Sequence, residues 1–290
     1  MLKITLPKGS LEEQTLLLFK EADLEVKKEF RGYNPVIYDP RISQVKILRP
    51  QEIPKYVEEG YFDLGITGLD CVLESKADVV EVADLPYSKV TTEPVKMVLA
   101  VFEESEIESP EQIPPGSRIS TEFPNITRDY FEKLGIPVKI FYSYGATEAK
   151  IPELMDVIVD LTETGETLRK NRLKIIGTIM ESTTKLIANK ESWKNSKKRG
   201  AIEEIKTLLL GVIEARGRVL LCMNVPEEKL DAVVRALPAM KKPTVSKLYH
   251  ANYYEVITVV NKSEVNTLIP KLKAKGAEDI LELNISKIVK

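Results

Sequence analysis

Hydrophobic and polar positions follow two alternating periodicities over roughly the first 210 residues, as in chains that alternate strands with helices. Short apolar runs at Leu2 to Leu6, Val45 to Leu48 and Asp63 to Ile66 predict strands. Between these runs, Ser10 and Pro50 are residue types that favour the start of a helix. The alternation predicts an α/β fold.

A second series of strands and helices begins with a strand expected from Arg118 to Thr121 and a helix expected from Phe123 to Leu134. Later strands, expected at Leu173 to Met180 and Lys185 to Ala188, could return the chain to the first series. The two series predict two lobes. The first lobe is expected at residues 1–90 with a returning segment at about 181–215, and the second at residues 91–180.

The pattern changes again near residue 215. Ser192 to Ala215 is expected to form one long helix, whose basic N-terminal end is most simply a solvated face. Beyond it the expected order is strand, helix, strand, strand, helix, strand, which is the split βαβ pattern. The strands are expected at Val219 to Val225, Thr244 to Tyr249, Tyr254 to Val260 and Ile280 to Ile285, and the helices at Pro226 to Leu237 and Ser263 to Lys275. Residues 216–290 are therefore predicted to form a ferredoxin-like domain.

Composition narrows the class of protein. The length of 290 residues suits two or three compact units. Lys and Arg together number 42 and Asp and Glu 44, and this near balance argues against nucleic acid as a partner. It does not exclude a local basic pocket for polyphosphate. The chain has no signal-peptide pattern and no apolar stretch of about 20 residues, so no membrane partner is expected.

Two residue types that often carry chemistry are scarce. Cys71 and Cys222 stand far apart in apolar surroundings, so we expect no disulfide framework and a reducing, cytoplasmic location. His250 is the only histidine, which leaves little basis for a His-based metal site or a Ser-His-Asp triad. Catalysis by this chain must therefore rely on other groups.

The segment from Asp160 to Leu168 carries the strongest candidate chemistry. It follows the apolar run Val157 to Val159 and predicts a loop between a buried strand end and a short helix. Gly165 could adopt a positive φ angle, and three threonines supply hydroxyl groups. Unpaired backbone N–H groups at such a turn could cradle a phosphate. The other open interpretation is an ordinary helix cap, because threonine and glutamate also suit a first turn.

The same segment, Asp-Leu-x-x-Thr-Gly-x-Thr-Leu, resembles the phosphoribosyl-pyrophosphate (PRPP) loop of ATP phosphoribosyltransferase, the enzyme that opens histidine biosynthesis. Five other segments resemble this family in the same order: Leu6 to Leu11, Ile47 to Pro50, Gly60 to Gly68, Arg118 to Pro124 and Gly145 to Glu148. The resemblance covers nearly the whole chain, including a C-terminal module typical of the long form of the enzyme.

The resemblance implies a two-lobed catalytic region like that of periplasmic binding proteins, with the ligand between the lobes. It implies transfer of the 5-phosphoribosyl group of PRPP to N1 of ATP with release of pyrophosphate. Mg²⁺ is the implied cofactor, held mainly by PRPP oxygens. Neutral adenine N1 is nucleophilic, so the protein chiefly has to align both substrates and neutralise the charge of the leaving group.

The resemblance also implies roles for individual residues. Those expected to bind PRPP are Asp160, Thr162, Glu163, Thr164, Gly165, Glu166 and Thr167. Those expected to face ATP or the second substrate are Lys8, Gly9, Arg49, Thr67, Gly68 and Asp70. Lys8, Arg49 and Asp160 are the candidate catalytic residues, and Glu148 is the candidate Mg²⁺ ligand.

Structural interpretations of these residues stay open. Lys8 could be an exposed loop lysine, Arg49 could form a surface salt bridge, and Asp70 could be a helix-start acid. The segment Pro152 to Met155 departs from the family, which often carries glycine and small residues there. This departure affects the expected shape of the loop that holds Glu148.

For the C-terminal domain the resemblance implies feedback inhibition by histidine, bound by Asn224, Thr244 and Asp279. Asn224 stands where an acidic residue is expected. The family also implies a homo-oligomer, with dimers assembling into hexamers.

Two other functions are compatible with this pattern: a two-lobed small-molecule binding protein and a non-catalytic metabolite-sensing subunit. The lack of a signal-peptide pattern argues against an exported binding protein. The presence of Lys8, Arg49, Asp160 and the complete loop argues against a silent subunit.

Overall fold

The computed structural model describes residues 1–28, 32, 34–87, 94–238 and 242–290. It divides into two compact units, Met1–Lys206 and Thr207–Lys290. The division falls inside helix α7 (Ser196–Ala215), ahead of residue 216, where the sequence places the start of the second domain. No helix in the described part of the chain is both long enough and apolar enough to cross a membrane.

The first lobe of the first unit contains a five-stranded sheet in the order β2-β1-β3-β10-β4. Its strands are β1 (Leu2–Pro7), β2 (Ile42–Leu48), β3 (Leu64–Gly68), β4 (Val80–Leu85) and β10 (Thr184–Ala188). Its helices are α1 (Glu12–Glu21), α2 (Ile53–Glu58) and α3 (Leu69–Ser75). β1 lies parallel to β2 and β3, whereas β10 lies antiparallel to β3 and β4.

The second lobe contains a five-stranded sheet in the order β7-β6-β8-β5-β9. Its strands are β5 (Val95–Phe102), β6 (Arg118–Thr121), β7 (Lys139–Tyr142), β8 (Val157–Thr162) and β9 (Leu173–Ser182). Its helices are α4 (Pro124–Leu134) and α5 (Glu166–Lys170), with short 3₁₀ turns η1 (Pro110–Gln112) and η2 (Thr147–Lys150).

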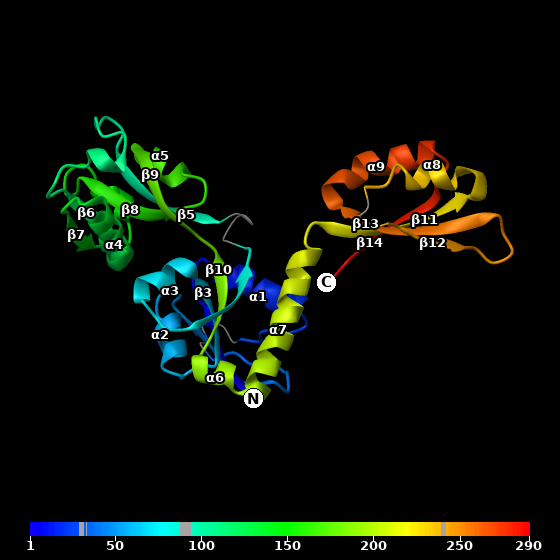
Figure 1. Cartoon of the computed structure of the whole chain (residues 1–290), viewed down its shortest axis with the longest axis horizontal. Coiled ribbons are helices and arrows are strands. Elements are labelled where there is room, and N and C mark those ends of the chain that lie inside the picture. The colour runs from blue at the N-terminus through cyan, green and yellow to red at the C-terminus, as the bar shows by residue number, and fades with distance from the viewer. Residues whose placement is uncertain (29–31, 33, 88–93, 239–241) are drawn as a thin grey trace. The chain divides into compact units, whose positions relative to one another are not determined.

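The chain returns from the second lobe to the first between β9 and β10. Only Thr183 separates these strands, which belong to different sheets. In Figure 1, yellow-green β10 lies beside cyan β3, which precedes it by more than a hundred residues in the chain. The two α/β lobes and the returning strand confirm the predicted two-lobed fold class.

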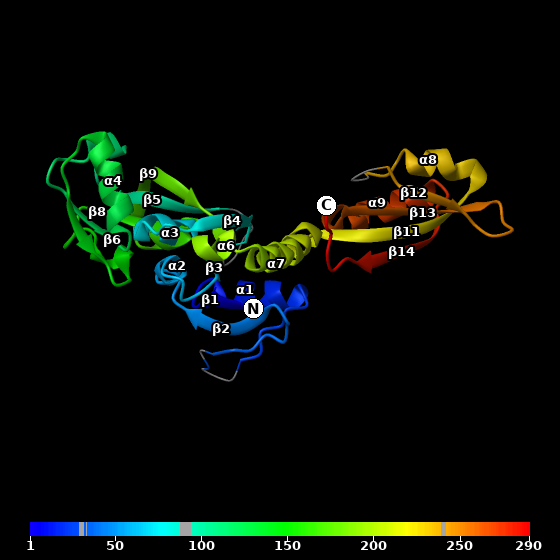
Figure 2. The ribbon, with the colours of Figure 1, turned by 60° about the horizontal axis from the view of Figure 1, so that its bottom comes forward.

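The second unit contains a four-stranded sheet in the order β12-β13-β11-β14, with antiparallel neighbours throughout. Its strands are β11 (Arg218–Pro226), β12 (Thr244–Lys247), β13 (Tyr253–Asn261) and β14 (Glu278–Asn284). Its helices are α8 (Leu230–Val234) and α9 (Lys262–Ala274), with the 3₁₀ turn η3 (Glu227–Lys229). Figure 1 shows both helices above the strands, on one face of the sheet, and Figure 2 gives the turned view of the same unit. This order and connectivity confirm the predicted ferredoxin-like domain.

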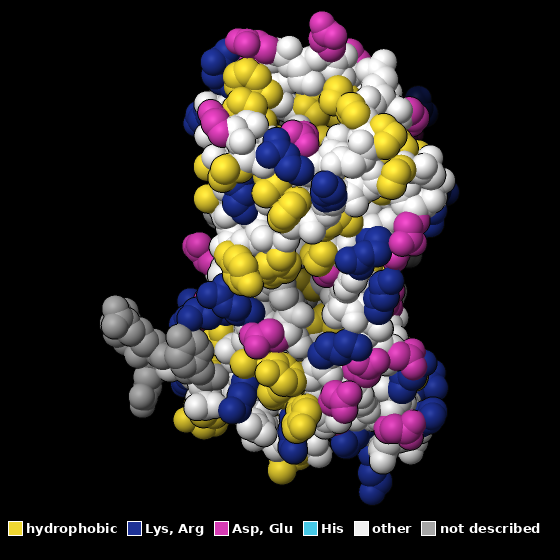
Figure 3. Space-filling model, turned by 90° about the vertical axis from the view of Figure 1, so that its left-hand side faces the viewer, with side chains coloured by type: hydrophobic (Ala, Val, Ile, Leu, Met, Phe, Trp, Pro, Cys, Tyr) yellow, Lys and Arg dark blue, Asp and Glu magenta, His cyan; other side chains and the backbone are white. Residues whose placement is uncertain are grey.

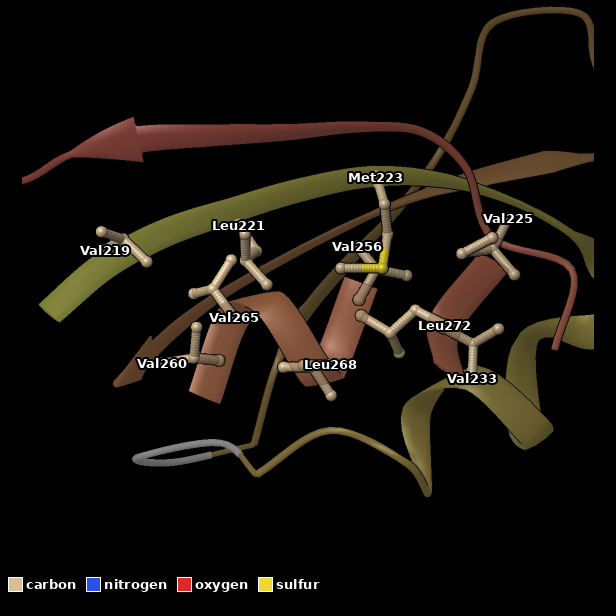
Figure 4. Packing of buried hydrophobic residues seen from close by; sticks show 11 residues of the cluster. Val219, Leu221, Met223, Val225, Val233, Val256, Val260, Val265, Leu268 and Leu272 are labelled. Atoms are coloured by element: carbon tan, nitrogen blue, oxygen red, sulfur yellow. The ribbon is translucent and has the colours of Figure 1, made fainter. Parts of the chain in front are cut away.

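The core of the second unit follows from alternation along β11. Val219, Leu221, Met223 and Val225 are buried and point toward the helices, where they pack with Leu272 and its neighbours on α9 (Figure 4). Each such side chain stabilises the fold by about 1.5–3 kcal/mol through removal from water. The intervening positions, such as Leu220 and Cys222, point to the opposite face of the sheet.

The prediction of a single helix from Ser192 to Ala215 is wrong. The segment forms α6 (Lys190–Lys194) and α7, separated at Asn195. The Asn195 carboxamide oxygen accepts the backbone N–H groups of Lys197 and Lys198, both at 3.1 Å, and so begins a new helix. The basic start of this segment is also not simply solvated, because the Lys198 ammonium lies 2.6 Å from the buried Asp63 carboxylate.

Other predicted helix starts are also corrected. The residue preceding α1 is Leu11 rather than Ser10, and the residue preceding α9 is Asn261 rather than Ser263. The helix predicted from Pro226 to Leu237 is shorter and begins as a 3₁₀ turn. Propensity alone therefore located these helices but not their ends.

Candidate functional site

A cavity of about 490 Å³ lies where strands of both lobes end. The first lobe contributes Ser10, Leu11, Pro50, Gln51, Gly68, Asp70 and Cys71. The second contributes Glu122, Phe123, Glu148, Thr167, Leu168 and the run from Asp160 to Thr164. The segments joining the lobes contribute Pro86, Tyr87, Pro94, Val95, Ser182, Thr183 and Thr184. Most of these residues lie at or just after the carboxyl ends of strands β1, β2, β3, β6 and β8, the usual position of ligand sites in open α/β sheets.

Charge in this cavity is acidic among the lining residues that the structure describes. Asp70, Glu122, Glu148, Asp160 and Glu163 line it, and no lysine or arginine stands among the described lining positions. On the face shown in Figure 3, basic and acidic side chains are interspersed. That face therefore does not share the acidic character of the cavity lining.

The Asp160 to Leu168 segment forms a loop that is stabilised by its own side chains. The Thr162 hydroxyl oxygen accepts the Gly165 N–H at 2.8 Å, and the Thr164 hydroxyl oxygen accepts the Glu166 N–H at 3.4 Å. Gly165 has a φ of 71° and precedes α5 without a side-chain cap. Glycine is favoured there because this left-handed conformation is costly for other residues.

The loop residues differ in what they face. Thr162, Glu163, Thr164 and Thr167 line the cavity, whereas Gly165 and Glu166 do not. The Glu166 carboxylate instead forms a surface ion pair with Lys170 at 2.7 Å. The side chain of Glu166 is thus directed away from the predicted phosphate, and only its backbone belongs to the loop.

Asp160 lies within β8 rather than after it, paired with Val98 of β5. Burial raises the pKa of its carboxyl to about 6, and the nearby carboxylates of Glu148 and Glu122 add to this rise. The Leu161 N–H, donated to the carboxylate at 2.7 Å, and the Lys150 ammonium oppose it. Asp160 is therefore poised to change charge near neutral pH.

Glu148 lies in η2 and reaches the same cavity as Asp160. In the segment that departs from the family pattern, Pro152, Glu153 and Leu154 are exposed and Met155 is half-buried. Ile151 is buried in one cluster with Ile158 and Leu168, and Met155 packs against that cluster. Of this segment, Met155 is the residue that contributes to apolar packing.

Asp70 opens α3 and is held by the strand that returns from the second lobe. Its carboxylate accepts the Ser182 hydroxyl at 2.5 Å, and its own N–H donates to the Ser182 oxygen at 3.1 Å. The Cys71 thiol, whose pKa is raised by burial, also donates to this carboxylate at 3.3 Å. A side chain at Gly68 would begin 2.1 Å from Asp70, so glycine is needed for this approach.

The structure does not bring every predicted ATP-facing residue to the cavity wall. Lys8, Gly9, Arg49 and Thr67 are absent from its described lining, although Ser10, Pro50 and Gly68, which directly follow Gly9, Arg49 and Thr67, belong to it. Lys8, Gly9 and Arg49 are exposed. Thr67 is completely buried, and its hydroxyl donates to the Pro50 carbonyl at 2.7 Å. Thr67 therefore supports the wall from behind.

Sequence reasoning missed the hydroxyl residues of the return between β9 and β10. Ser182 binds Asp70, the Thr183 hydroxyl donates to Asp84 at 2.7 Å, and the Thr184 hydroxyl donates to the Tyr87 carbonyl at 2.7 Å. Three consecutive hydroxyl residues at the junction of two strands were a visible signal. Their partners, however, lie about a hundred residues away in the sequence and only the fold brings them together.

The residues present fit a Mg²⁺ ion carried by a substrate better than a metal held by protein alone. The described part of the chain has no group of three or more His, Cys, Asp or Glu side chains able to hold a metal. Glu148 and Asp160 nevertheless present carboxylate oxygens, the ligands that Mg²⁺ prefers alongside substrate phosphates.

In the second unit, two of the three predicted histidine-binding residues meet. The Asn224 amide donates to the Asp279 carboxylate at 2.9 Å. Thr244 lies on β12, opposite Ile257, so the whole of β13 separates it from Asn224 on β11. The three residues therefore do not form one compact pocket in a single chain.

Comparison with known proteins gives two matching family models. The model described as ATP phosphoribosyltransferase matches residues 49–211, and the model described as HisG, C-terminal domain, matches residues 215–287.

Relatives match over almost the full length. An ATP phosphoribosyltransferase of Pelotomaculum thermopropionicum is 47% identical over 99% of this chain and 99% of its own. That of Desulforudis audaxviator is 46% identical with the same coverage. Among solved structures, the ATP phosphoribosyl transferase (HisG:HisZ) complex of Thermotoga maritima is 29% identical with a TM-score of 0.62, covering 72% of this chain and 99% of that one. The chain thus belongs to the ATP phosphoribosyltransferase family, in the long form that carries the C-terminal domain.

Proposed function

We propose that this protein transfers the 5-phosphoribosyl group of PRPP to N1 of ATP, giving 1-(5-phosphoribosyl)-ATP and pyrophosphate, the first step of L-histidine biosynthesis. The observation that carries the proposal is the Asp160 to Thr167 loop, which borders a cavity shared by both lobes. A solute-binding protein would need only one ligand there. The relatives' common name supports two-substrate chemistry.

The second lobe would hold PRPP. The N–H groups and hydroxyls of Thr164 and Thr167, which line the cavity, would bind the 5-phosphate. The N–H groups of Gly165 and Glu166 donate within the loop and would join them only by leaving those bonds. Asp160, which lines the cavity, would accept hydrogen bonds from the ribose hydroxyls when its carboxyl is ionised. The second lobe therefore fixes C1 of the ribose, the atom that is attacked.

The first lobe would hold ATP. Gly68 and Asp70 would face it directly, and Lys8, Gly9 and Arg49, exposed beside the lining segments, would reach its phosphates. Guanidinium and ammonium groups suit phosphate oxygens. Holding both substrates in line supplies much of the rate enhancement, because adenine N1 needs no base to activate it.

Glu148 and Asp160 would hold Mg²⁺ together with PRPP oxygens, since their carboxylates share the cavity. When bound, Mg²⁺ neutralises charge on the departing pyrophosphate. The acidic lining is consistent with substrates that enter with their cations, because free polyphosphate would be repelled by five carboxylates.

The test is direct. The full chain is incubated with ATP, PRPP and Mg²⁺, and the absorbance change of phosphoribosyl-ATP is followed, with Asp160→Asn as a control. We expect product from the wild type and a much slower reaction from the variant. Absence of product at several salt concentrations and pH values would refute the proposed reaction.

Histidine inhibition is proposed to act through the pair formed by Asn224 and Asp279. The Asp279 carboxylate is an acceptor suited to the ammonium of an amino acid. Asp279→Ala should weaken inhibition about tenfold or more, since a charge-assisted bond is lost, and should leave the uninhibited rate unchanged. Measuring the rate against histidine concentration tests this, and an unchanged half-inhibiting concentration would make the assignment wrong.

A homo-oligomer is proposed from the open face of the second unit's sheet. Apolar side chains continue across three strands there, because Leu220 lies opposite Val259 and Leu283, and Cys222 lies opposite Ile257 and Leu281. Leu281 is 59% and Leu283 46% exposed. A second copy of the chain is the proposed cover.

The double variant Leu281→Asp and Leu283→Asp should lower the oligomeric state measured by sedimentation. The control is Leu154→Asp, a position 61% exposed in the other unit. Equal sedimentation of the two variants would contradict this interface.

A further inference from the structure

Helix α3 of the first lobe contacts the first turn of helix α4 of the second lobe. The Glu74 carboxylate, in the last turn of α3, accepts backbone N–H groups from the first turn of α4. Asn125 donates to both carboxylate oxygens at 3.0 Å, and Ile126 donates to one of them at 3.0 Å. The Asn125 amide also donates to the Glu74 carbonyl at 2.9 Å.

Helix α4 depends on this contact because its own sequence supplies no cap. Pro124 occupies its first position and has no N–H group, and the preceding Phe123 makes no side-chain cap bond. The next two N–H groups, of Asn125 and Ile126, are those that Glu74 accepts. A carboxylate also suits the positive end of this 11-residue helix. One lobe therefore caps a helix of the other.

The contact lies within a few residues of both walls of the cavity. Helix α3 begins at Leu69, and its next residues, Asp70 and Cys71, line the cavity. Glu122 and Phe123, immediately before α4, line it from the other lobe. Glu74 lies one helical turn from Asp70. A shift at Glu74 thus changes the separation of the two walls.

We propose that Glu74 is a positioning residue for the transfer reaction, holding the ATP wall and the PRPP wall at the separation at which N1 can reach C1. This inference rests on the proposed function, since it assumes that each lobe holds one substrate. Glu74 touches neither substrate and acts through the first turns of α3 and α4.

A neighbouring ion pair provides a matched control. The Lys76 ammonium lies 3.1 Å from the Asp129 carboxylate and joins the same two helical regions. The two side chains are 58% and 47% exposed, so the ion pair contributes little to holding the two lobes together. Lys76→Ala should therefore change kcat by no more than about twofold.

Glu74→Ala should lower kcat about 10- to 100-fold, because misplacement of reacting atoms by about 1 Å has effects of this size. The Kd for PRPP with Mg²⁺, measured by calorimetry, should stay unchanged, because the loop belongs to one lobe. Glu74→Gln keeps the length and one acceptor oxygen and should restore most of the rate. Glu74→Asp keeps the charge but is shorter, and should remain slow.

Hydrogen exchange of the Asn125 and Ile126 amides tests the contact independently of catalysis. Both amides should exchange faster in Glu74→Ala and at the wild-type rate in Lys76→Ala. Equal kcat values for Glu74→Ala and Lys76→Ala, or a fall in PRPP affinity that matches the fall in kcat, would overturn the positioning role. Absence of product from the wild type would instead overturn the proposed reaction. Unchanged exchange of the two amides in Glu74→Ala would overturn the contact between Glu74 and the start of α4.

Discussion

The two walls of the cavity are built in different ways. The wall from the second lobe is largely one continuous segment, Asp160 to Leu168, stabilised by bonds between residues two or three apart. The wall from the first lobe is assembled from separate segments that follow β1, β2 and β3. Its bonds span long distances in the sequence, as between Asp70 and Ser182.

This difference indicates how each wall should respond to change. In a local loop, a substitution alters the ligand contacts directly and leaves the rest of the fold in place. In a composite wall, each residue also holds another segment, as Thr67 holds Pro50. The following substitutions test whether PRPP belongs to the local wall and ATP to the composite one.

The largest effect is expected from combining Gly165→Val with Thr167→Ala. Valine at a φ of 71° would distort the loop, and the second change removes a hydroxyl donor. Losing two bonds to a charged phosphate should weaken PRPP binding by roughly 100-fold or more, measured by calorimetry with Mg²⁺.

Gly135→Val is the matched control for that variant. Gly135 has a φ of 70° at the end of α4 and does not line the cavity. Gly135→Val should lower the melting temperature about as much as the double variant does but leave PRPP affinity unchanged. If PRPP affinity fell equally in both proteins, general destabilisation and not the loop would explain the loss.

Asp160→Asn is expected to have the next largest effect, about 10- to 100-fold on kcat/KM for PRPP at pH 8, because an acceptor with full charge is lost. The wild-type rate should fall as the pH drops below about 6, where the carboxyl becomes protonated. The variant should lack this fall. A wild-type profile that stays flat through pH 6 would show that ionised Asp160 is not required.

Ionisation of Asp160, which is expected to raise the rate, is expected to lower the stability of the fold. The folded protein holds this proton more tightly than the unfolded chain does, since burial raises the pKa of Asp160 to about 6. Ionisation between about pH 4 and pH 6 therefore lowers stability, by at most about 3 kcal/mol. Asp160→Asn should melt above the wild type at pH 8 and close to it at pH 4, as measured by calorimetry.

Arg49→Ala is expected to have the smallest effect of this group, raising KM for ATP about tenfold with PRPP affinity unchanged. Lys55→Ala is the control, because Lys55 is a surface residue of the same lobe paired with Glu58. Steady-state rates at varied ATP measure the change. A loss of PRPP affinity as large as the rise in KM would remove the distinction between the two walls.

Much of the fold could be predicted from periodicity. The central strands, the order of elements and the ferredoxin-like topology follow from apolar runs and their spacing, as Val219 to Val225 illustrates. Helix ends were predicted less well, because Asn195 and Asn261 begin helices where serine or an uninterrupted pattern was expected. The cap at Asn195 depends on side-chain bonds that periodicity does not reveal, whereas Asn261 precedes its helix without such a bond.

The residues of the candidate site also differ in how far they could be predicted from the sequence. The Asp160 to Thr167 loop was predictable because its bonds are local and its residue types are characteristic. The contributions of Ser182 and Glu122 were not, because their neighbours in space are distant in sequence.

By itself, the sequence determined the elements, the phosphate loop and the resemblance to a family, since these depend on neighbouring residues and short-range periodicity. Only the tertiary structure decided that Thr67 supports the wall from behind, that Asp160 has a pKa near 6, and that Glu74 caps a helix of the opposite lobe. Burial and long-range hydrogen bonds arise when segments far apart in the chain are packed together, and they cannot be assigned before the packing is known.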